Sequence, residues 1–519
     1  MSKVTSKAVF KAYDQQQLLL LPPSLDELVP PSHLVRVINR VVNRMDLSSI
    51  VNQYEGGGAS AYHPKMLTKV LLYGYATKIY TGRKLAKALM QDVTFMWLAA
   101  SSKPDFRTIN LFRSGVLKET IEELFKELLL FLVDHGFVNV ENYFTDGTTL
   151  SADANRHKVV WRKNAERYKK IAEQNCQKLF KEIDALNAQE DINYGEKNLE
   201  EMGSELIDNQ TIENQVQKLN QVIAKTGKKI VAIKAKSLKR QIQEQKEKIN
   251  QYDQQLQISE HRSGYSKTDT EATAMRLKNS EDLVPAYNVM ASCENQFITA
   301  ISVHQNPNDA SCFKEHVEQF PLKPSTITAD SIFGTEQNYE LLEGSEIKSF
   351  LKFPTFDPQN TSHKKKNKKF LREHFIYNKE KDAYKCPDGR ELEFKRTEII
   401  KNRKTGYQST VNTYQSKSCN QCTLAGQCKT SLESNRTLSV NSQLDHYRQQ
   451  ARNNLNSSQG LALRKRRGAE IESCFGDIKH NMEFRRFHLR GKQKVKTEIG
   501  LVSMAHNLRK IQIQLKLVA

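Results

Sequence analysis

Two short β-prone segments each lead into an aspartate, and the long stretch between them limits what the chain can fold into. Val138 to Phe144 precedes Asp146, and Ser325 to Thr328 precedes Asp330. Turn-forming or polar residues follow both aspartates, so the pattern predicts that each lies at the end of a sheet strand. Between the two aspartates lie 183 residues, far more than neighbouring strands of one sheet need. The sequence therefore predicts an α/β core whose strands are separated by insertions.

A third carboxylate, Glu472, lies in a segment with helical periodicity. Apolar residues recur around it at helical spacing and place it at the edge of a buried stripe. They are Ile471, Phe475, Ile478 and Met482. Two strand ends and a facing helix can bring Asp146, Asp330 and Glu472 together. Carboxylate oxygens suit Mg²⁺ or Mn²⁺, and two such ions roughly 4 Å apart can hold the attacking and leaving oxygens of a phosphodiester. The alternative is that the three carboxylates have no common role, because a chain with 59 acidic residues offers many such sets of three.

Several longer motifs accompany these carboxylates. They are Tyr62-His-Pro-Lys65, Leu71-Leu-Tyr-Gly-Tyr75, Pro104-Asp-Phe-Arg-Thr-Ile109 with Phe112-Arg113, Pro285-Ala-Tyr-Asn-Val289, Ser302-Val-His-Gln305, Ala329-Asp330, and Glu472-Ser-Cys-Phe-Gly476 leading to Phe484-Arg-Arg-Phe487 and Leu489-Arg-Gly491. In these motifs the chain resembles bacterial insertion-sequence transposases of the DDE type, in the branch with a separate helical N-terminal transposase domain. The resemblance covers most of the chain apart from one helical insert. It implies a ribonuclease-H-like catalytic core in which Asp146, Asp330 and Glu472 are the catalytic metal ligands.

The resemblance also implies an activity and partners. It predicts a transposase that binds the ends of its own insertion sequence, cuts double-stranded DNA with divalent metals, and joins the freed 3′-hydroxyl to target DNA, acting as a homodimer on DNA. One alternative is a metal-dependent nuclease without strand transfer. Another is a DNA-binding regulator whose triad is inactive.

Related transposases carry a Tyr-x2-Arg-x3-Glu-x6-Lys signature, which this chain keeps in part. Glu472 and Lys479 have the last spacing, while Lys465 and Gly468 stand where the Tyr and Arg would fall. One of two residues close to that position is expected to supply the arginine contact: Arg466 or Arg467. Lys479 lies two helical turns beyond Glu472, so we expect it to hold a DNA phosphate next to the metals.

The charge of the chain agrees with a polyanionic partner. Its 79 basic and 59 acidic residues give a formal charge of +20. Residues 461–519 contain 14 Lys or Arg against 5 Asp or Glu, a net of +9. Such a surplus favours DNA through counterion release; an anionic membrane would also attract it, but the clustering beside Glu472 favours DNA. Three arginines are expected to hold the phosphates that flank the scissile bond, or else to be surface charges or partners of core carboxylates: Arg485, Arg486 and Arg490.

Membrane insertion and export are not expected. The apolar run Leu18 to Leu21 is too short to span a bilayer and ends at Pro22-Pro23. We therefore expect an intracellular protein that acts in the cytoplasm on nucleoid DNA.

The N-terminal region, residues 1–136, is predicted to be an all-α domain. Ser24 and Glu27 form a capping box, and an apolar stripe with helical spacing follows. Further helices are expected near residues 67–79, 84–90 and 118–133. The family resemblance favours DNA-end binding by this domain, with Gly56 to Gly58 and Arg107 to Arg113 as candidate phosphate contacts. The alternative is a set of simply solvated helix faces.

Two insertions are expected to interrupt the catalytic core, which comprises residues 137–163, 262–354 and 462–519. Residues 164–261 are rich in Lys, Gln, Glu and Asn with leucine and isoleucine at helical intervals, which predicts a long helical hairpin. It is either a clamp or dimer contact, or a solvated helix pair. Residues 355–461 form the second insertion and contain the basic run Lys364 to Lys369.

Four cysteines in the second insertion suggest a zinc site. Cys419 and Cys422 form a Cys-x2-Cys pair, with Cys386 before it and Cys428 after it, on turn-rich sequence. Such a set suits tetrahedral Zn²⁺, and disulfides are less expected in a reducing cytoplasm. The other four cysteines are scattered and predicted to be packing residues: Cys176, Cys293, Cys312 and Cys474.

Overall fold

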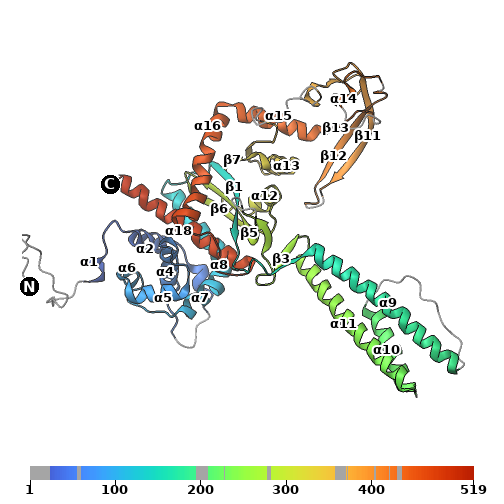
Figure 1. Ribbon diagram of the computed structural model, residues 1–519. Helices are drawn as coiled ribbons and strands as arrows, with labels where there is room; N and C mark the ends of the chain where they lie inside the picture. The colour runs from blue at the N-terminus through green and yellow to red at the C-terminus, as the bar shows by residue number, and fades with distance from the viewer. Residues whose placement is uncertain are drawn as a thin grey trace, which may run out of the picture.

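The computed structural model describes residues 24–54, 60–194, 209–226, 228–277, 282–356, 370, 372–402, 405–419, 421–428 and 435–518. A central mixed sheet is packed against a group of N-terminal helices, and two arms project from it (Figure 1). The candidate phosphate loop Gly56 to Gly58 and the basic run Lys364 to Lys369 lie outside the described residues.

Five strands form the centre of the molecule in the order β6-β5-β1-β7-β8. β5 runs antiparallel to β1 and β6 antiparallel to β5, whereas β7 and β8 run parallel to β1. Helices α12 and α13 make the crossovers that parallel strands require. The elements are β1 (Asn142–Ser151), β5 (Leu283–Glu294), β6 (Phe297–His304), α12 (Asp309–Glu318), β7 (Thr326–Ala329), α13 (Glu336–Gly344) and β8 (Lys348–Leu351).

Strand β1 is longer than the sequence predicts. The expected strand ends before Asp146, but the observed one continues to Ser151, because pairing with β5 extends along its whole second half. The neighbour on the other side is shorter, and the last pair of β1 with β7 is Thr145 with Ala329. Asp146 therefore lies inside a strand, yet it is the first residue beyond the edge of the parallel neighbour.

The N-terminal helices are α1 (Leu25–Leu28), α2 (Leu34–Arg44), α3 (Ser48–Val51), α4 (Pro64–Ala76), α5 (Gly82–Gln91), α6 (Val93–Leu98), α7 (Phe106–Leu111) and α8 (Leu117–Asp134). The N-cap half of the predicted capping box is confirmed, since the Glu27 N–H donates to Ser24 Oγ at 3.3 Å, whereas Glu27 Oε1 accepts from Ser24 Oγ at 3.0 Å instead of from the Ser24 N–H. It starts only the single turn α1. The apolar stripe begins anew at α2, where His33 Nδ1 accepts from the Val35 N–H at 3.3 Å.

These helices share one apolar core with the sheet. They pack against the last helix, α18 (Lys492–Val518). Tyr75 donates a hydrogen bond to the buried Glu498 carboxylate of α18 at 3.2 Å, and Tyr80 donates to the carbonyl of Met482. Arg113, a candidate phosphate contact, is only 4% exposed and donates to Tyr75 Oη at 3.1 Å. It is therefore a structural residue where the N-terminal helices pack against α18.

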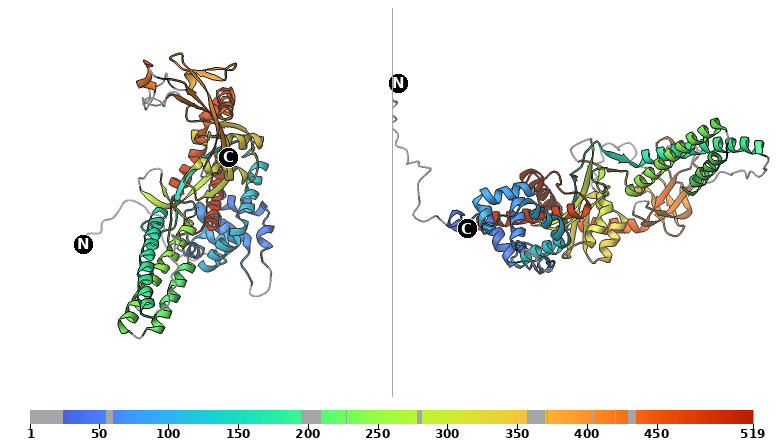
Figure 2. Two further views of the ribbon diagram at one scale, coloured as in Figure 1. Left: turned by 90° about the vertical axis from the view of Figure 1, so that its right-hand side faces the viewer. Right: turned by 90° about the horizontal axis from the view of Figure 1, so that it is seen from below.

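The first arm is helical and is carried on short strands at the end of the sheet (Figure 2). Its elements are β2 (Val159–Trp161), α9 (Arg162–Tyr194), α10 (Asn209–Lys225), α11 (Lys229–Ser259), β3 (Gly264–Ser266) and β4 (Thr273–Arg276). α9 and α11 form the predicted pair and are joined by an ion pair between Lys169 and Asp253 at 2.6 Å. The sequence did not predict α10 as a third helix. The arm has its own apolar core, which includes Leu219 and Leu238.

The second arm is a five-stranded antiparallel sheet in the order β13-β12-β11-β10-β9. Its strands are β9 (Ile376–Asn378), β10 (Ala383–Lys385), β11 (Glu391–Lys401), β12 (Gln408–Ser416) and β13 (Thr437–Val440), with the short helix α14 (Ala425–Cys428). Glu336 of α13 anchors this arm, because its Oε2 accepts from Ser409 Oγ and from Asn441 Nδ2, both at 2.6 Å. Helix α15 (Ser442–Asn456) then returns to the core along β8 and α13. None of the helices in the described ranges is long and apolar enough to cross a bilayer.

Candidate active site

Asp146 and Asp330 lie side by side on neighbouring parallel strands. Each is the residue that follows the register pair Thr145 with Ala329, so both lie at the carboxyl edge of β7. Asp330 follows its strand as predicted. Each aspartate Oδ1 accepts a hydrogen bond from the next backbone N–H, at 2.8 Å for Asp146 and 2.7 Å for Asp330. The sheet and these bonds together fix both carboxylates.

A continuous helical stretch crosses β1 and β5; we call it the Glu472 helix (residues 458–481). The guanidinium of Arg466 lies 5.4 Å from the centre of the Phe144 ring. Further along the helix, Lys479 Nζ donates to Thr148 Oγ1 at 2.5 Å. Phe144 and Thr148 flank Asp146 on one face of β1, because side chains alternate along a strand. The helix therefore contacts β1 on both sides of Asp146.

Glu472 is placed between these two contacts in the helix. Its side chain is 62% exposed, and its Oε1 lies 3.6 Å from Arg467 Nη2. Within the described ranges, no three His, Cys, Asp or Glu side chains stand close enough to hold one metal ion. The structure thus brings Asp146 and Asp330 together and puts Glu472 on the facing helix, paired with an arginine.

The pairing of Glu472 with Arg467 has a local cause. Residues Gly468–Glu472 form a π-helical turn, in which residues five apart are neighbours along the helix. Arg467 precedes Glu472 by five positions. Of the two arginines expected to replace the signature arginine, Arg467 is thus the one that reaches Glu472, whereas Arg466 pairs with Glu470 at 2.7 Å.

A buried histidine holds the Glu472 helix to α18. His506 Nδ1 lies 2.8 Å from Asp477 Oδ2, and His506 Nε2 lies 3.0 Å from the carbonyl oxygen of Gln296. Both partners are acceptors, so both ring nitrogens must donate and the imidazole is charged. Burial alone would lower the pKa of His506, but hydrogen bonds to Asp477 and Cys474 raise that pKa to about 10. Burial opposes ionisation of Asp477 too, yet its bond to His506 lowers its pKa to about 2.

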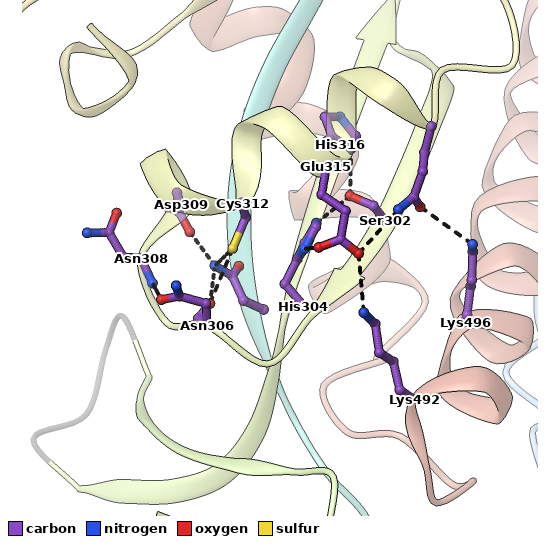
Figure 3. A network of polar contacts seen from close by, with 12 residues as sticks. Ser302, His304, Asn306, Asn308, Asp309, Cys312, Glu315, His316, Lys492 and Lys496 are labelled. Atoms are coloured by element: carbon purple, nitrogen blue, oxygen red, sulfur yellow. Dashed lines mark hydrogen bonds and ion pairs between the residues drawn. The ribbon is translucent and has the colours of Figure 1, made fainter. Parts of the chain in front are cut away.

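The opposite face of β1 rests on a chain of polar side chains, and Figure 3 shows the part of it from His316 to Lys492. Hydrogen bonds of 2.6–3.2 Å link Thr145, Ser292, His316, Ser302, His304, Glu315 and Lys492 in that order. Burial lowers the pKa of His316 to about 3, so this ring is neutral, and the hydrogen bond from His304 lowers the pKa of Glu315 to about 2. Satisfied buried networks rigidify a core. This one fixes β1 directly behind Asp146.

Gly147 allows α12 to approach the same face of β1. A Cβ atom at Gly147 would lie 2.5 Å from Asp309 Cγ, closer than real side chains come. Asp309 is held by the Asn288 amide, whose Nδ2 donates to Oδ1 at 2.6 Å, next to the polar chain (Figure 3). Any larger residue after Asp146 would therefore displace the Asp309 carboxylate from this position.

The segment Phe484 to Gly491 connects the Glu472 helix to α18, and it contacts both the N-terminal helices and the residues that follow β1. Phe484 packs against Tyr80 with ring centres 5.2 Å apart. Arg486 and Arg490 both pair with Asp153, at 2.8 and 2.9 Å, and Arg485 Nε donates to the Lys479 carbonyl at 3.0 Å. Asp153 lies in a bend after β1. All six residues predicted to bind DNA have partners within the chain: Arg466, Arg467, Lys479, Arg485, Arg486 and Arg490.

The four cysteines of the second insertion converge on one small cavity. Cys386, Cys419, Cys422 and Cys428 all line a space of about 20 Å³ at the end of the second sheet. Backbone turns shape it, with the Gly389 N–H bonded to the Cys386 carbonyl at 2.8 Å. Burial raises the pKa of the Cys428 thiol. The other four cysteines are buried, as expected of packing residues: Cys176, Cys293, Cys312 and Cys474.

Comparison with known families gives two matches. Residues 23–115 match a family described as a transposase domain (DUF772), and residues 385–512 match one described as a transposase DDE domain. The second match includes Glu472 and the four cysteines but neither Asp146 nor Asp330. No curated protein and no solved structure matches the chain. The two family matches support a DDE-type insertion-sequence transposase with a separate N-terminal domain.

Proposed function

We propose that the chain binds the ends of its insertion sequence, cuts DNA in a metal-dependent reaction and transfers the strand to target DNA. The observation that carries this proposal is the register of β1 and β7, which makes Asp146 and Asp330 neighbours beneath the Glu472 helix. The strand order β6-β5-β1-β7-β8, with helical crossovers, supports a ribonuclease-H-like core.

Asp146, Asp330 and Glu472 would hold Mg²⁺ or Mn²⁺. The donor set fits, because hard cations take carboxylate oxygens. The ions supply charge for the reacting phosphate and an activated water or hydroxyl. The chain itself positions the ligands: backbone N–H groups orient the two aspartates, and Glu472 is exposed enough to turn from Arg467 toward them. Arg467 then remains beside the site as a cation for a phosphate.

The partners follow from the family. We propose that the N-terminal helices, within residues 1–136, bind transposon-end DNA, and that the core formed by residues 137–163, 262–354 and 462–519 acts on it as a homodimer in the cytoplasm. Lys479 extends from the Glu472 helix toward the end of β1 that follows Asp146, a position suited to a phosphate. Arg486 and Arg490 are less suited, because a phosphate would have to displace Asp153.

We also propose that the four cysteines bind a structural Zn²⁺. Four thiols on turns around one small cavity are the donor set of closed zinc sites. The cavity is about the size of one water. The metal would draw Cys386, Cys419, Cys422 and Cys428 closer than they are here, and it would replace thiol protons that burial retains on Cys428.

A strand-transfer assay tests the proposed function. The purified protein is incubated with a duplex that carries the terminal repeat flanking its gene, a supercoiled target plasmid and Mg²⁺. We expect nicked ends and end DNA covalently joined to the plasmid. Cleavage without joined product would indicate a nuclease, and binding without any cleavage would indicate a regulator.

A further inference from the structure

Three arginines that belong to none of the family motifs lie over aromatic rings near Asp330. The guanidinium carbons of Arg448 and Arg452, on α15, lie 5.7 and 5.6 Å from the centre of the Phe353 ring. Arg464, on α16 (Ser458–Arg467), lies 5.1 Å from the centre of Phe356. Cation–π contacts of this kind hold a guanidinium in a fixed orientation.

The sheet places these rings at the catalytic edge. β8 runs parallel to β7, so the residues after β8 leave the sheet at the same end as Asp330. The turn after Asp330 also touches them, because a Cβ at Gly334 would lie 2.1 Å from the Lys352 carbonyl oxygen and 2.9 Å from Phe353 Cα. The rings, and the arginines that lie over them, are therefore beside the end of β8, the strand next to the one that Asp330 follows.

The positive charges of these three arginines are not neutralised by an acidic partner within the described residues. Arg448, Arg452 and Arg464 take part in none of the ion pairs that the described part of the chain contains. The buried Nε atoms of Arg448 and Arg464 also have no hydrogen-bond partner there. Residues 442–467 hold six basic residues and one acidic residue, Asp445, which is already paired with Arg372.

We infer that Arg448, Arg452 and Arg464 form a phosphate-binding row that holds the DNA backbone as it leaves the catalytic edge. A guanidinium stacked on a ring keeps its N–H groups in a plane that points past the ring, which is the geometry that phosphate oxygens accept. The inference rests on the proposed function, since it needs DNA at Asp330. It assigns the contacts to the DNA phosphate backbone to these three arginines, which have no anionic partner in the described residues. The earlier candidates Arg485, Arg486 and Arg490 are already bonded within the chain.

The test measures DNA affinity against salt for the full chain. One duplex carries the element's end and the other is unrelated and of equal length. In the variant Arg448→Gln/Arg452→Gln/Arg464→Gln, we expect weaker binding to both duplexes and a slope of log affinity against log salt smaller by about 0.9 for each lost contact. The control Arg486→Gln/Arg490→Gln removes cations of the same kind and should change the slope by less than about half a unit.

The outcomes separate this inference from the proposed function. If wild type binds both duplexes and the folded triple variant keeps the wild-type slope, the row is wrong and the proposed function stands. If wild type binds neither duplex at low salt, both fail together. Should the triple variant not fold, Arg452→Glu decides in its place: its side chain is exposed, and charge reversal should lower the slope by at least about one unit.

Discussion

The two candidate metal sites are built in opposite ways. The carboxylates come from residues 146, 330 and 472, and a β-ladder in the main core places two of them. The four cysteines of the cluster fall between residues 386 and 428, at the end of a small sheet. Among the described residues, the core of this sheet has six buried side chains: Phe375, Tyr384, Leu392, Tyr414, Leu438 and Val440. A site placed by the core should lose a ligand without unfolding. A site at the end of a small sheet should depend on its metal for structure.

The strongest test of this contrast removes one carboxylate at a time. Asp146→Asn, Asp330→Asn and Glu472→Gln should each lower the cleavage rate at least ~100-fold, since a lost metal ligand removes several kcal/mol of transition-state stabilisation. Melting temperature and end binding should stay near wild type. Cleavage by gel assay, with calorimetry alongside, measures both.

A matched control for the carboxylates is Glu318→Gln, an exposed residue at the end of α12. It should cut DNA at the wild-type rate. Normal cleavage by any one of the three site variants would remove that residue from the triad, and a large drop in melting temperature would show that the carboxylate is structural.

The second test removes the proposed zinc. Purified protein should carry close to one zinc per chain, and Cys419→Ser/Cys422→Ser should carry almost none. Because structural zinc contributes on the order of 10 kcal/mol to small domains, the second sheet should become protease-sensitive while the main core stays folded. Elemental analysis and limited proteolysis measure these effects.

Cys176→Ser serves as the zinc control, because this cysteine is buried in the helical arm. It should keep the full zinc content. Zinc-free wild-type protein with all four thiols of the cluster freely reactive would rule out the site and remove the contrast.

A smaller effect concerns how the Glu472 helix is held. The pKa of His506 is raised to about 10 in the folded protein, above the usual value near 6.5. A raised pKa adds stability that is complete below pH ~6.5 and is lost as the pH rises toward 10. Chemical denaturation should therefore show stability falling across that range. In His506→Gln the fall should be absent, and the variant should be about 3 kcal/mol less stable at pH 6.5 because Asp477 loses its partner.

That pH test has a matched control in His480→Gln, whose ring is exposed beside Arg485. It should retain the wild-type dependence on pH. If His506→Gln keeps the same slope, another group titrates and His506 does not clamp the Glu472 helix to α18.

Local patterns in the sequence predicted much of the fold. The strand before Asp330, helices α4, α5 and α8, and the long pair α9 and α11 follow from periodicity and turn residues. The full length of β1 did not, because it depends on pairing with β5, a long-range contact. The third helix α10 has helical periodicity of its own, but periodicity alone did not separate it from the neighbouring helices.

The site was predictable in its residue types and less so in its contacts. Spacing and motifs single out Asp146, Asp330 and Glu472, but only the strand register makes the first two neighbours. The partners of Arg486 and Arg490 could not be foreseen, because Asp153 reaches them from another segment. The stacked row had a faint signal: arginines four residues apart on one helix face.

The central claim is that Asp146 and Asp330 are metal ligands, and a change of metal preference tests it most directly. Asp146→Cys and Asp330→Cys replace an oxygen donor by sulfur, which disfavours Mg²⁺ more than the softer Mn²⁺. We predict that each variant is inactive in Mg²⁺ and regains cleavage in Mn²⁺, while wild type cuts in both. Cleavage of end DNA in Mg²⁺ at the wild-type rate by either variant would contradict the claim.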